Sequence, residues 1–180
     1  CFTLHHLAVA GVDQVGGEPI DDVLARLLSE VDGRSTHTFF SYRIAETLLR
    51  HGPFDGNPLL ADLTAEQRAE VALAVDSSDW LELLDAGVLP RNYAGVLARC
   101  ELARVQLGLV TDTTRLDELV GRVDEVLGGN PRRALDDSND RIGRYDIYTA
   151  DVWLFTEPLA SRVGPVWDDG MGRALDLVLA

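Results

Sequence analysis

The sequence predicts an all-α protein built of helix hairpins, and three observations support this fold class. Apolar residues recur at spacings of three and four along most of the chain, which is the period of one helix face. Glycine, alone or followed by proline, closes several of these periodic segments. No segment alternates apolar and polar residues over more than a few positions, as a half-buried strand would. At 180 residues the chain can bury a core, and we expect a single helical domain over residues 1–180.

Four helices are predicted in the first half of the chain, each a run of apolar residues at helical spacing that ends at a turn signal. Their ranges are 20–31, 36–51, 64–75 and 80–86. Pro19 stands at the start of the first helix, and Gly52 closes the second. Thr64 and Gln67 have the spacing of a capping box, in which each side chain bonds to the backbone N–H of the other residue.

Four more helices are predicted in the second half. They cover 92–107, 114–127 and 145–161, and the last begins near residue 165. Asn92 is a favourable N-cap for the first of them, and Gly108 closes it. Pro158 lies inside the third, where a proline is expected to kink an α-helix.

The aromatic-rich helices indicate a repeated hairpin. They begin near residues 36, 92 and 145, which gives a period near 55 residues. The first two share a frame in which an arginine is followed nine residues later by glycine, as Arg43 with Gly52 and Arg99 with Gly108. Such a period is typical of the inner and outer helices of an α/α array, so we expect the chain to form part of an (α/α)6 toroid.

Composition excludes several classes of function. The formal net charge is -14, from 16 Lys+Arg against 30 Asp+Glu, and this acidity disfavours a nucleic-acid partner. Every basic residue is arginine, so no lysine is present for a Schiff base or a P-loop. No apolar run reaches the roughly 18 residues that span a membrane. The bias toward Arg, Ala and Leu over Lys indicates a GC-rich bacterial coding sequence.

The cysteines and the two ends of the sequence carry further expectations. The two cysteines are distant and form no CxxC motif, and Cys100 lies mid-helix in an apolar context typical of a buried inert thiol. The chain starts with Cys1 rather than Met, and it stops inside a helical pattern over 173–180. We therefore expect a fragment whose partner is the remainder of its own longer chain or another chain.

The densest polar cluster covers residues 136–148 and precedes a predicted helix, whose N-terminus favours anions. Four arginines between residues 132 and 144 make this stretch a basic spot in an acidic chain. Arg144, Asp146 and Tyr148 are close in sequence. Together they can position a sugar, or supply a phenol and a carboxylate for acid–base work.

This stretch and the Asn92–Tyr93 helix start resemble bacterial (α/α) toroid proteins of the DUF2264 type, relatives in fold of heparinase- and alginate-lyase-like lyases and of unsaturated glucuronyl hydrolases. In those proteins an Asp/Gly/Ser turn leads to an Arg-aromatic-Asp-x-Tyr start of an inner helix, here 136–140 followed by 144–148. The resemblance covers about residues 85–180. In this chain the turn has Asp-Ser-Asn where Gly is usual, and the chain is about half of a full toroid.

The resemblance implies a carbohydrate-active enzyme, a polysaccharide lyase or glycoside hydrolase, acting on a small-molecule or oligosaccharide substrate without a cofactor. Residues at the inner-helix starts would then line one cleft: His37, Tyr42, Asn92, Tyr93, Arg144, Asp146 and Tyr148. Asp146 is expected as the acid–base or substrate-binding carboxylate. Tyr148 is expected as a proton donor or sugar platform, and Arg144 as the group that holds a carboxylate or hydroxyl.

Two alternatives remain open. Asp136, Asp137 and Asp140 have the Asp-Asp-x-x-Asp spacing that binds Mg²⁺ carrying a diphosphate in class I isoprenoid (terpene-type) synthases, which are also all-α. The second metal motif of those enzymes is absent, and Ser, Asn and the following Arg-Ile-Gly favour a turn. In the other alternative the chain is a non-catalytic helical interaction module, in which these residues only cap helices.

Overall fold

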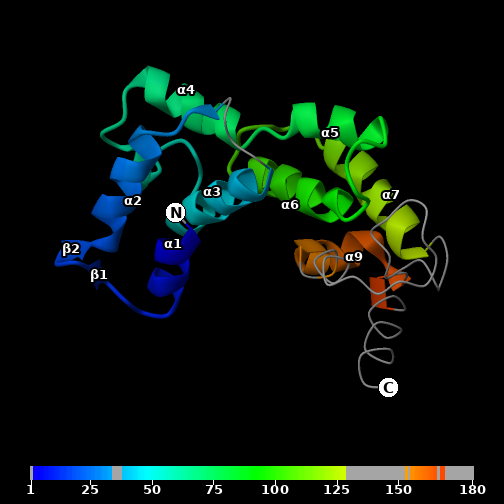
Figure 1. The fold of residues 1–180 in the computed structure, drawn as a ribbon, viewed down its shortest axis with the longest axis horizontal. Coiled ribbons are helices and arrows are strands. Elements are labelled where there is room, and N and C mark those ends of the chain that lie inside the picture. The colour runs from blue at the N-terminus through cyan, green and yellow to red at the C-terminus, as the bar shows by residue number, and fades with distance from the viewer. Residues whose placement is uncertain (1, 34–37, 129–152, 154, 166, 169–180) are drawn as a thin grey trace. The chain divides into compact units, whose positions relative to one another are not determined.

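The computed structural model describes residues 2–33, 38–128, 153, 155–165 and 167–168, and these are mostly helical (Figure 1). The α-helices are α1 (Phe2–Val9), α2 (Ile20–Ser29), α3 (Thr38–His51), α4 (Ala65–Ala74), α5 (Ser78–Asp85), α6 (Tyr93–Gln106), α7 (Thr114–Gly128) and α9 (Ala160–Val163). Two 3₁₀ turns, η2 (Pro58–Leu60) and η3 (Glu157–Leu159), accompany them. Within the described ranges, no helix is both long enough and apolar enough to cross a bilayer.

A small β-hairpin is the departure from the all-α prediction. Strand β1 (Gln14–Val15) pairs antiparallel with β2 (Glu18–Pro19), and Val15 lies opposite Glu18. The turn between them is Gly16–Gly17, with φ values of 64° and 87°, as a two-residue type I′ turn requires. Strands of two residues are too short to show an alternating pattern, so the sequence periodicity could not indicate them.

The predicted helix starts are confirmed where the capping signal is local. Thr64 Oγ1 accepts the Gln67 N–H at 3.2 Å, and Gln67 Oε1 accepts the Thr64 N–H at 2.9 Å, which completes the capping box of α4. The Gln67 side-chain amide also donates to the Ser29 carbonyl at 3.1 Å, so the same residue ties the start of α4 to the end of α2.

Glycine ends the two helices that share the arginine–glycine frame. Helices α3 and α6 are both 14 residues long, and Gly52 and Gly108 follow them with φ values of 117° and 78°. At the second, Gly108 N–H donates to the Val105 carbonyl and Leu109 N–H to the Arg104 carbonyl, which is the Schellman pattern. The frame therefore marks equivalent helix ends.

The helical run is interrupted at Pro158, where the sequence predicted a kink. Phe155 and Thr156 are helical, Pro158 lies in the 3₁₀ turn η3, and α9 begins directly after that turn. Proline lacks the N–H that a continuing α-helix needs, whereas the first positions of a 3₁₀ turn do not require it. Residues 145–152, which were predicted to begin this helix, lie outside the described residues.

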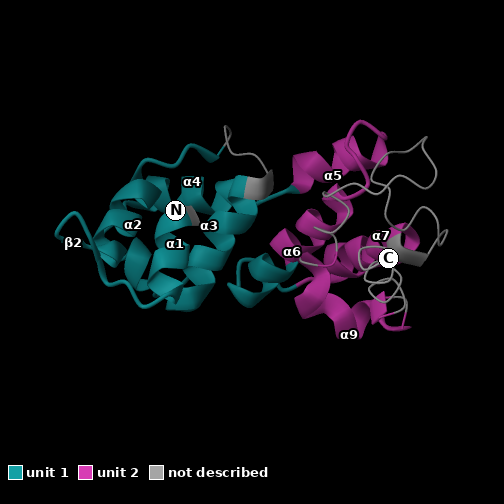
Figure 2. Cartoon of the chain, turned by 60° about the horizontal axis from the view of Figure 1, so that its bottom comes forward, with its two compact units in different colours: residues 1–77, 102–111 teal, residues 78–101, 112–180 magenta. Residues whose placement is uncertain are grey.

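The chain divides into two compact units, residues 1–77 with 102–111 and residues 78–101 with 112–180 (Figure 2). The core of unit 1 consists of fully buried aliphatic side chains from α2, α3, η2, α4 and the end of α6. Its largest members are Ile20, Leu24, Leu28, Leu48, Leu60 and Leu107. A buried amide braces this unit, because Asn57 donates to the carbonyls of Leu48 and Gly52 and accepts the Leu59 N–H.

In unit 2, helices α5, α6 and α7 alternate in direction. Arg115 near the start of α7 contacts Ser78 at the start of α5, and Arg122 one heptad later contacts Asp85 at the end of α5. The two helices therefore run parallel. Glu101, late in α6, lies 4.0 Å from Arg115, so α6 runs the opposite way. This alternation supports a helix-hairpin array, and Cys100 of α6 is a buried free thiol as predicted.

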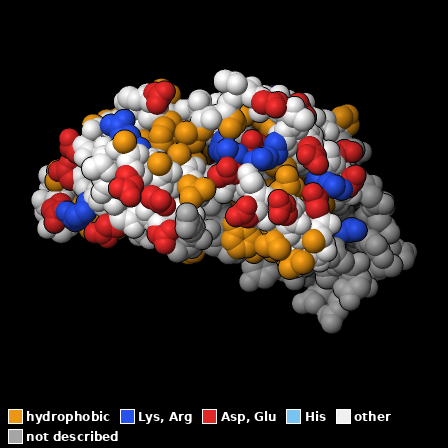
Figure 3. Space-filling model, turned by 90° about the horizontal axis from the view of Figure 1, so that it is seen from above, with side chains coloured by type: hydrophobic (Ala, Val, Ile, Leu, Met, Phe, Trp, Pro, Cys, Tyr) orange, Lys and Arg blue, Asp and Glu red, His pale blue; other side chains and the backbone are white. Residues whose placement is uncertain are grey.

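Acidic side chains are spread over the face of the molecule shown in Figure 3, with arginines in small groups among them. This distribution agrees with the formal charge of -14. In unit 1, Arg50 of α3 donates to the carbonyl of Ala8 at 2.9 Å, which also accepts the Gly11 N–H at the end of α1.

We predict opposite effects for alanine at two glycines. A Cβ on Gly33 would lie 2.7 Å from the Glu70 carbonyl oxygen and 2.8 Å from Leu73 Cβ, whereas a Cβ on Gly121 in α7 meets no described atom within 4 Å. Gly33→Ala should lower the free energy of unfolding by about 1–3 kcal/mol, because packed backbone must move. Gly121→Ala should raise it by about 0.5–1 kcal/mol, because alanine favours a helix. Chemical denaturation measures both, and equal stabilities would contradict the close approach at Gly33.

We also predict that His5 in α1 makes the stability of the fold sensitive to acid. Burial lowers the pKa of His5 from 6.5, and it is opposed by Glu46 and reinforced by His6, Arg50 and Arg43. Below pH 6.5 the unfolded chain binds a proton that the folded chain does not, so stability should fall as the pH decreases from 6.5 to the folded-state pKa. Unfolding curves at pH 7.5 and 5.5 test this. His5→Gln should reduce the difference, while His6→Gln, which removes only a smaller Coulombic contribution to the pKa of His5, should retain most of it.

Candidate functional site

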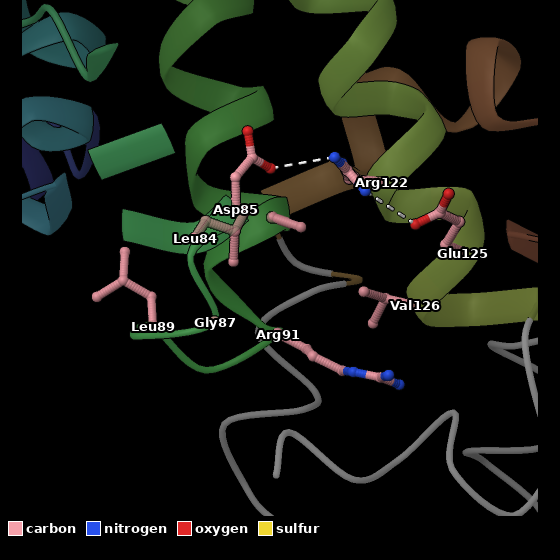
Figure 4. Close-up of a pocket in the computed structure, with 9 residues that line it drawn as sticks. Leu84, Asp85, Gly87, Leu89, Arg91, Arg122, Glu125 and Val126 are labelled. Atoms are coloured by element: carbon pink, nitrogen blue, oxygen red, sulfur yellow. Dashed lines mark hydrogen bonds and ion pairs between the residues drawn. The ribbon is translucent and has the colours of Figure 1, made fainter. Parts of the chain in front are cut away.

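A cleft of about 220 Å³ lies in unit 2 where the end of α5, the loop 86–92, the start of α6 and the second half of α7 meet (Figure 4). It combines two arginines and two carboxylates with aliphatic walls. The lining residues are Leu84, Asp85, Gly87, Leu89, Arg91, Ala94, Arg122, Glu125 and Val126. A concave site with aliphatic walls and a few convergent polar groups is the usual form of a small-molecule site.

A helix-ending glycine shapes the loop side of the cleft. Gly87 has a φ of 69°, its N–H donates to the Leu84 carbonyl, and the Val88 N–H donates to the Leu83 carbonyl. These two bonds form a Schellman motif, which ends α5 abruptly and turns the chain into the loop. A residue with a Cβ would be strained at this φ, so glycine is required at the turn.

The charged group of the cleft is a network of two ion pairs that share Arg122. Arg122 Nη2 lies 3.1 Å from Asp85 Oδ1, and Arg122 Nη1 lies 3.5 Å from Glu125 Oε2. The three side chains are 42%, 41% and 70% exposed, so solvent and a ligand can reach them. Each carboxylate uses one oxygen for the arginine, and among the described residues the other oxygen has no bond. The ion pairs therefore position the two carboxylates, and each carboxylate still offers a hydrogen-bond acceptor.

Two of the predicted residues flank this cleft. Asn92 precedes α6 and Tyr93 begins it, between the lining residues Arg91 and Ala94. Asn92 is buried, and its carbonyl accepts the Gly95 N–H at 3.1 Å. Burial raises the pKa of the Tyr93 phenol above 10, so this hydroxyl stays protonated and able to donate at neutral pH. The helix start was correctly located, but its two residues border the cleft and do not line it.

Of the other predicted site residues, only Tyr42 lies in the part of the chain that the structure describes. Tyr42 belongs to unit 1, is 6% exposed, and carries the Arg43 guanidinium 4.7 Å from its ring centre, which is a packing arrangement. The remaining candidates lie outside the described residues: His37, Asp136, Asp137, Asp140, Arg144, Asp146 and Tyr148. In the described part of the chain, no group of three or more His, Cys, Asp or Glu side chains could hold a metal ion.

Sequence reasoning missed Asp85, Arg122 and Glu125. Arg122 and Glu125 stand three residues apart on the polar face of α7, a spacing that ordinary solvated helices also show. Asp85 lies 37 residues earlier in the sequence. The Gly87 turn signal indicated a helix end, and only the tertiary structure shows what that end contacts.

Comparison with known proteins finds no matching family model, no matching curated protein and no matching solved structure.

The contact that aligns the cleft helices gives a stability prediction. Glu101 is 2% exposed and faces the partly exposed Arg115 across 4.0 Å. Glu101→Gln should lower the free energy of unfolding by about 2 kcal/mol, because it removes a buried charge partner of that arginine. Glu118→Gln, an exposed carboxylate on α7, is the matched control and should stay within about 0.5 kcal/mol of the parent. Equal losses in both variants, measured by urea unfolding, would contradict a supporting role for Glu101.

Proposed function

We propose that this chain belongs to a carbohydrate-active enzyme, a polysaccharide lyase or glycoside hydrolase, with the cleft of unit 2 as a sugar-binding site. The observation that carries the proposal is the cleft beside the Asn92–Tyr93 helix start, where the sequence placed a substrate-binding position. Its carboxylates and guanidinium suit adjacent hydroxyls, which donate to the former and accept from the latter. Its aliphatic wall suits the C–H face of a sugar ring.

The proposed chemistry rests on residues 144–148. In a hydrolase, Asp146 or Tyr148 would protonate the leaving glycosidic oxygen while water is activated on the other side of the sugar. In a lyase, a base would remove the proton beside a uronate carboxylate, and the leaving oxygen would take a proton from the phenol of Tyr148. Arg144 would neutralise negative charge in either case.

We further propose that the hairpins belong to an (α/α)6 toroid. The alternating directions of α5, α6 and α7 support this. Helices α3 and α6 also support it, because they have the same length and each is followed by a glycine. In a toroid, inner-helix starts gather at one mouth, which would bring the start of α6 and residues 144–148 to the same side.

The test is turnover of oligosaccharides by the chain and by Asp146→Asn. We expect Asp146→Asn to abolish turnover with little change in Tm, because the substitution keeps the shape and removes the ionisable group. Asp124→Asn, an exposed carboxylate on α7, is the control and should retain turnover. Full activity in Asp146→Asn would refute the assignment.

A thermal-shift screen separates the other classes, since a ligand that binds the folded state raises the Tm. Stabilisation by Mg²⁺ with pyrophosphate, lost in Asp136→Ala, would replace the carbohydrate proposal with metal-diphosphate chemistry. Absence of any shift together with absence of turnover would favour a non-catalytic helical module.

A further inference from the structure

We infer that the cleft between α5, α6 and α7 accepts one uncharged sugar ring and discriminates against uronates and amines. The inference rests on the proposed function and narrows the ligand class of this cleft, so a lyase would have to bind its uronate ring outside it. It is carried by the charge arrangement of Asp85, Arg122 and Glu125, by the balance of charges over the lining and by the size of the cleft.

The guanidinium group of Arg122 already has two partners. Arg122 is placed between Asp85 at 3.1 Å and Glu125 at 3.5 Å. A ligand carboxylate would have to displace one of these partners, and it would meet the remaining carboxylates in a chain of formal charge -14. Replacing one anion by another gains no net charge pairing, so the cleft gives a uronate no advantage.

A cationic ligand is disfavoured by the same geometry. An amine that approached Asp85 and Glu125 would come close to Arg122, which lies between them and pairs with both. Like charges at this separation repel, and the cation would have to break an existing ion pair to gain its own. The charges of the lining balance, with two arginines, one aspartate and one glutamate.

An uncharged polyol can form hydrogen bonds with Asp85, Arg122 and Glu125 without breaking the ion pairs between them. Each carboxylate keeps one oxygen outside its bond to Arg122, and a guanidinium has five N–H donors, of which the two ion pairs use part. Neighbouring hydroxyls can donate to a carboxylate oxygen and accept from the arginine at once, as hydrogen bonds that involve charged groups. Leu84, Leu89 and Val126 provide the apolar side.

The volume of the cleft matches one sugar ring. At about 220 Å³ it holds roughly seven waters of about 30 Å³ each. Sites for drug-sized ligands occupy about 300–1,000 Å³, so a disaccharide would extend beyond this cleft. We therefore assign it as a single subsite for an uncharged ring.

The experiment is a titration of the folded chain with neutral pyranosides and with the matching uronates at pH 7, followed by NMR or calorimetry. We expect the neutral sugars to bind more tightly, with an affinity that changes little between low and high salt. Asp85→Asn and Glu125→Gln should each weaken neutral-sugar binding by about tenfold, as expected for loss of a hydrogen bond to a charged group. Glu18→Gln breaks an exposed ion pair in unit 1 and should leave binding unchanged.

The outcomes separate this inference from the proposed function. Tighter binding of uronates than of neutral sugars would overturn the inference and leave a carbohydrate-active enzyme intact. The inference would also be overturned if Asp85→Asn and Glu125→Gln bound neutral sugars as tightly as Glu18→Gln does, because the sugar would then be held elsewhere. If no saccharide binds and none is turned over, both fail. Circular dichroism checks that each variant is folded.

Discussion

Two arginines of α7, one heptad apart, keep the site-bearing helices of unit 2 in register. Arg115 contacts Ser78 and Arg122 contacts Asp85, and both contacts join residues 37 apart in sequence. Seven residues span two helical turns, so both arginines lie on the same side of α7 and both partners on the same side of α5. A shift of α7 by one turn would separate Arg122 from Asp85. The cleft walls would then no longer face each other.

The sequence predicted the helix ends well because their signals are local. The capping box of Thr64 and Gln67 and the closing glycines at 52, 87 and 108 each act within a few residues, through bonds between neighbouring backbone and side-chain groups. The β-hairpin escaped the same reasoning, because strands of two residues carry no periodicity. Its one local signal was the Gly16–Gly17 pair, which is a turn sequence in its own right.

The candidate site was predictable only where a helix end marked it. Asn92 gave the start of α6 through its capping preference, and the structure places that start beside a cleft. Asp85 and Arg122 look like ordinary residues on solvated helix faces, and their meeting depends on the packing of α5 against α7. For Tyr42 the sequence gives no preference between the two roles, since an aromatic one turn into a helix is as well suited to packing as to binding, and here it is buried.

Because the chain has no lysine, the cations of the cleft are guanidinium groups, which have a property that an ammonium lacks. A guanidinium is planar and carries five N–H donors, so Arg122 can pair with Asp85 on one side and Glu125 on the other and still have donors for a ligand. An ammonium in its place would be a compact charge with three donors, and two carboxylates would use most of them. Arg91 balances the remaining negative charge of this group, which stays available for hydrogen bonds. That combination favours a ligand with hydroxyls and no net charge.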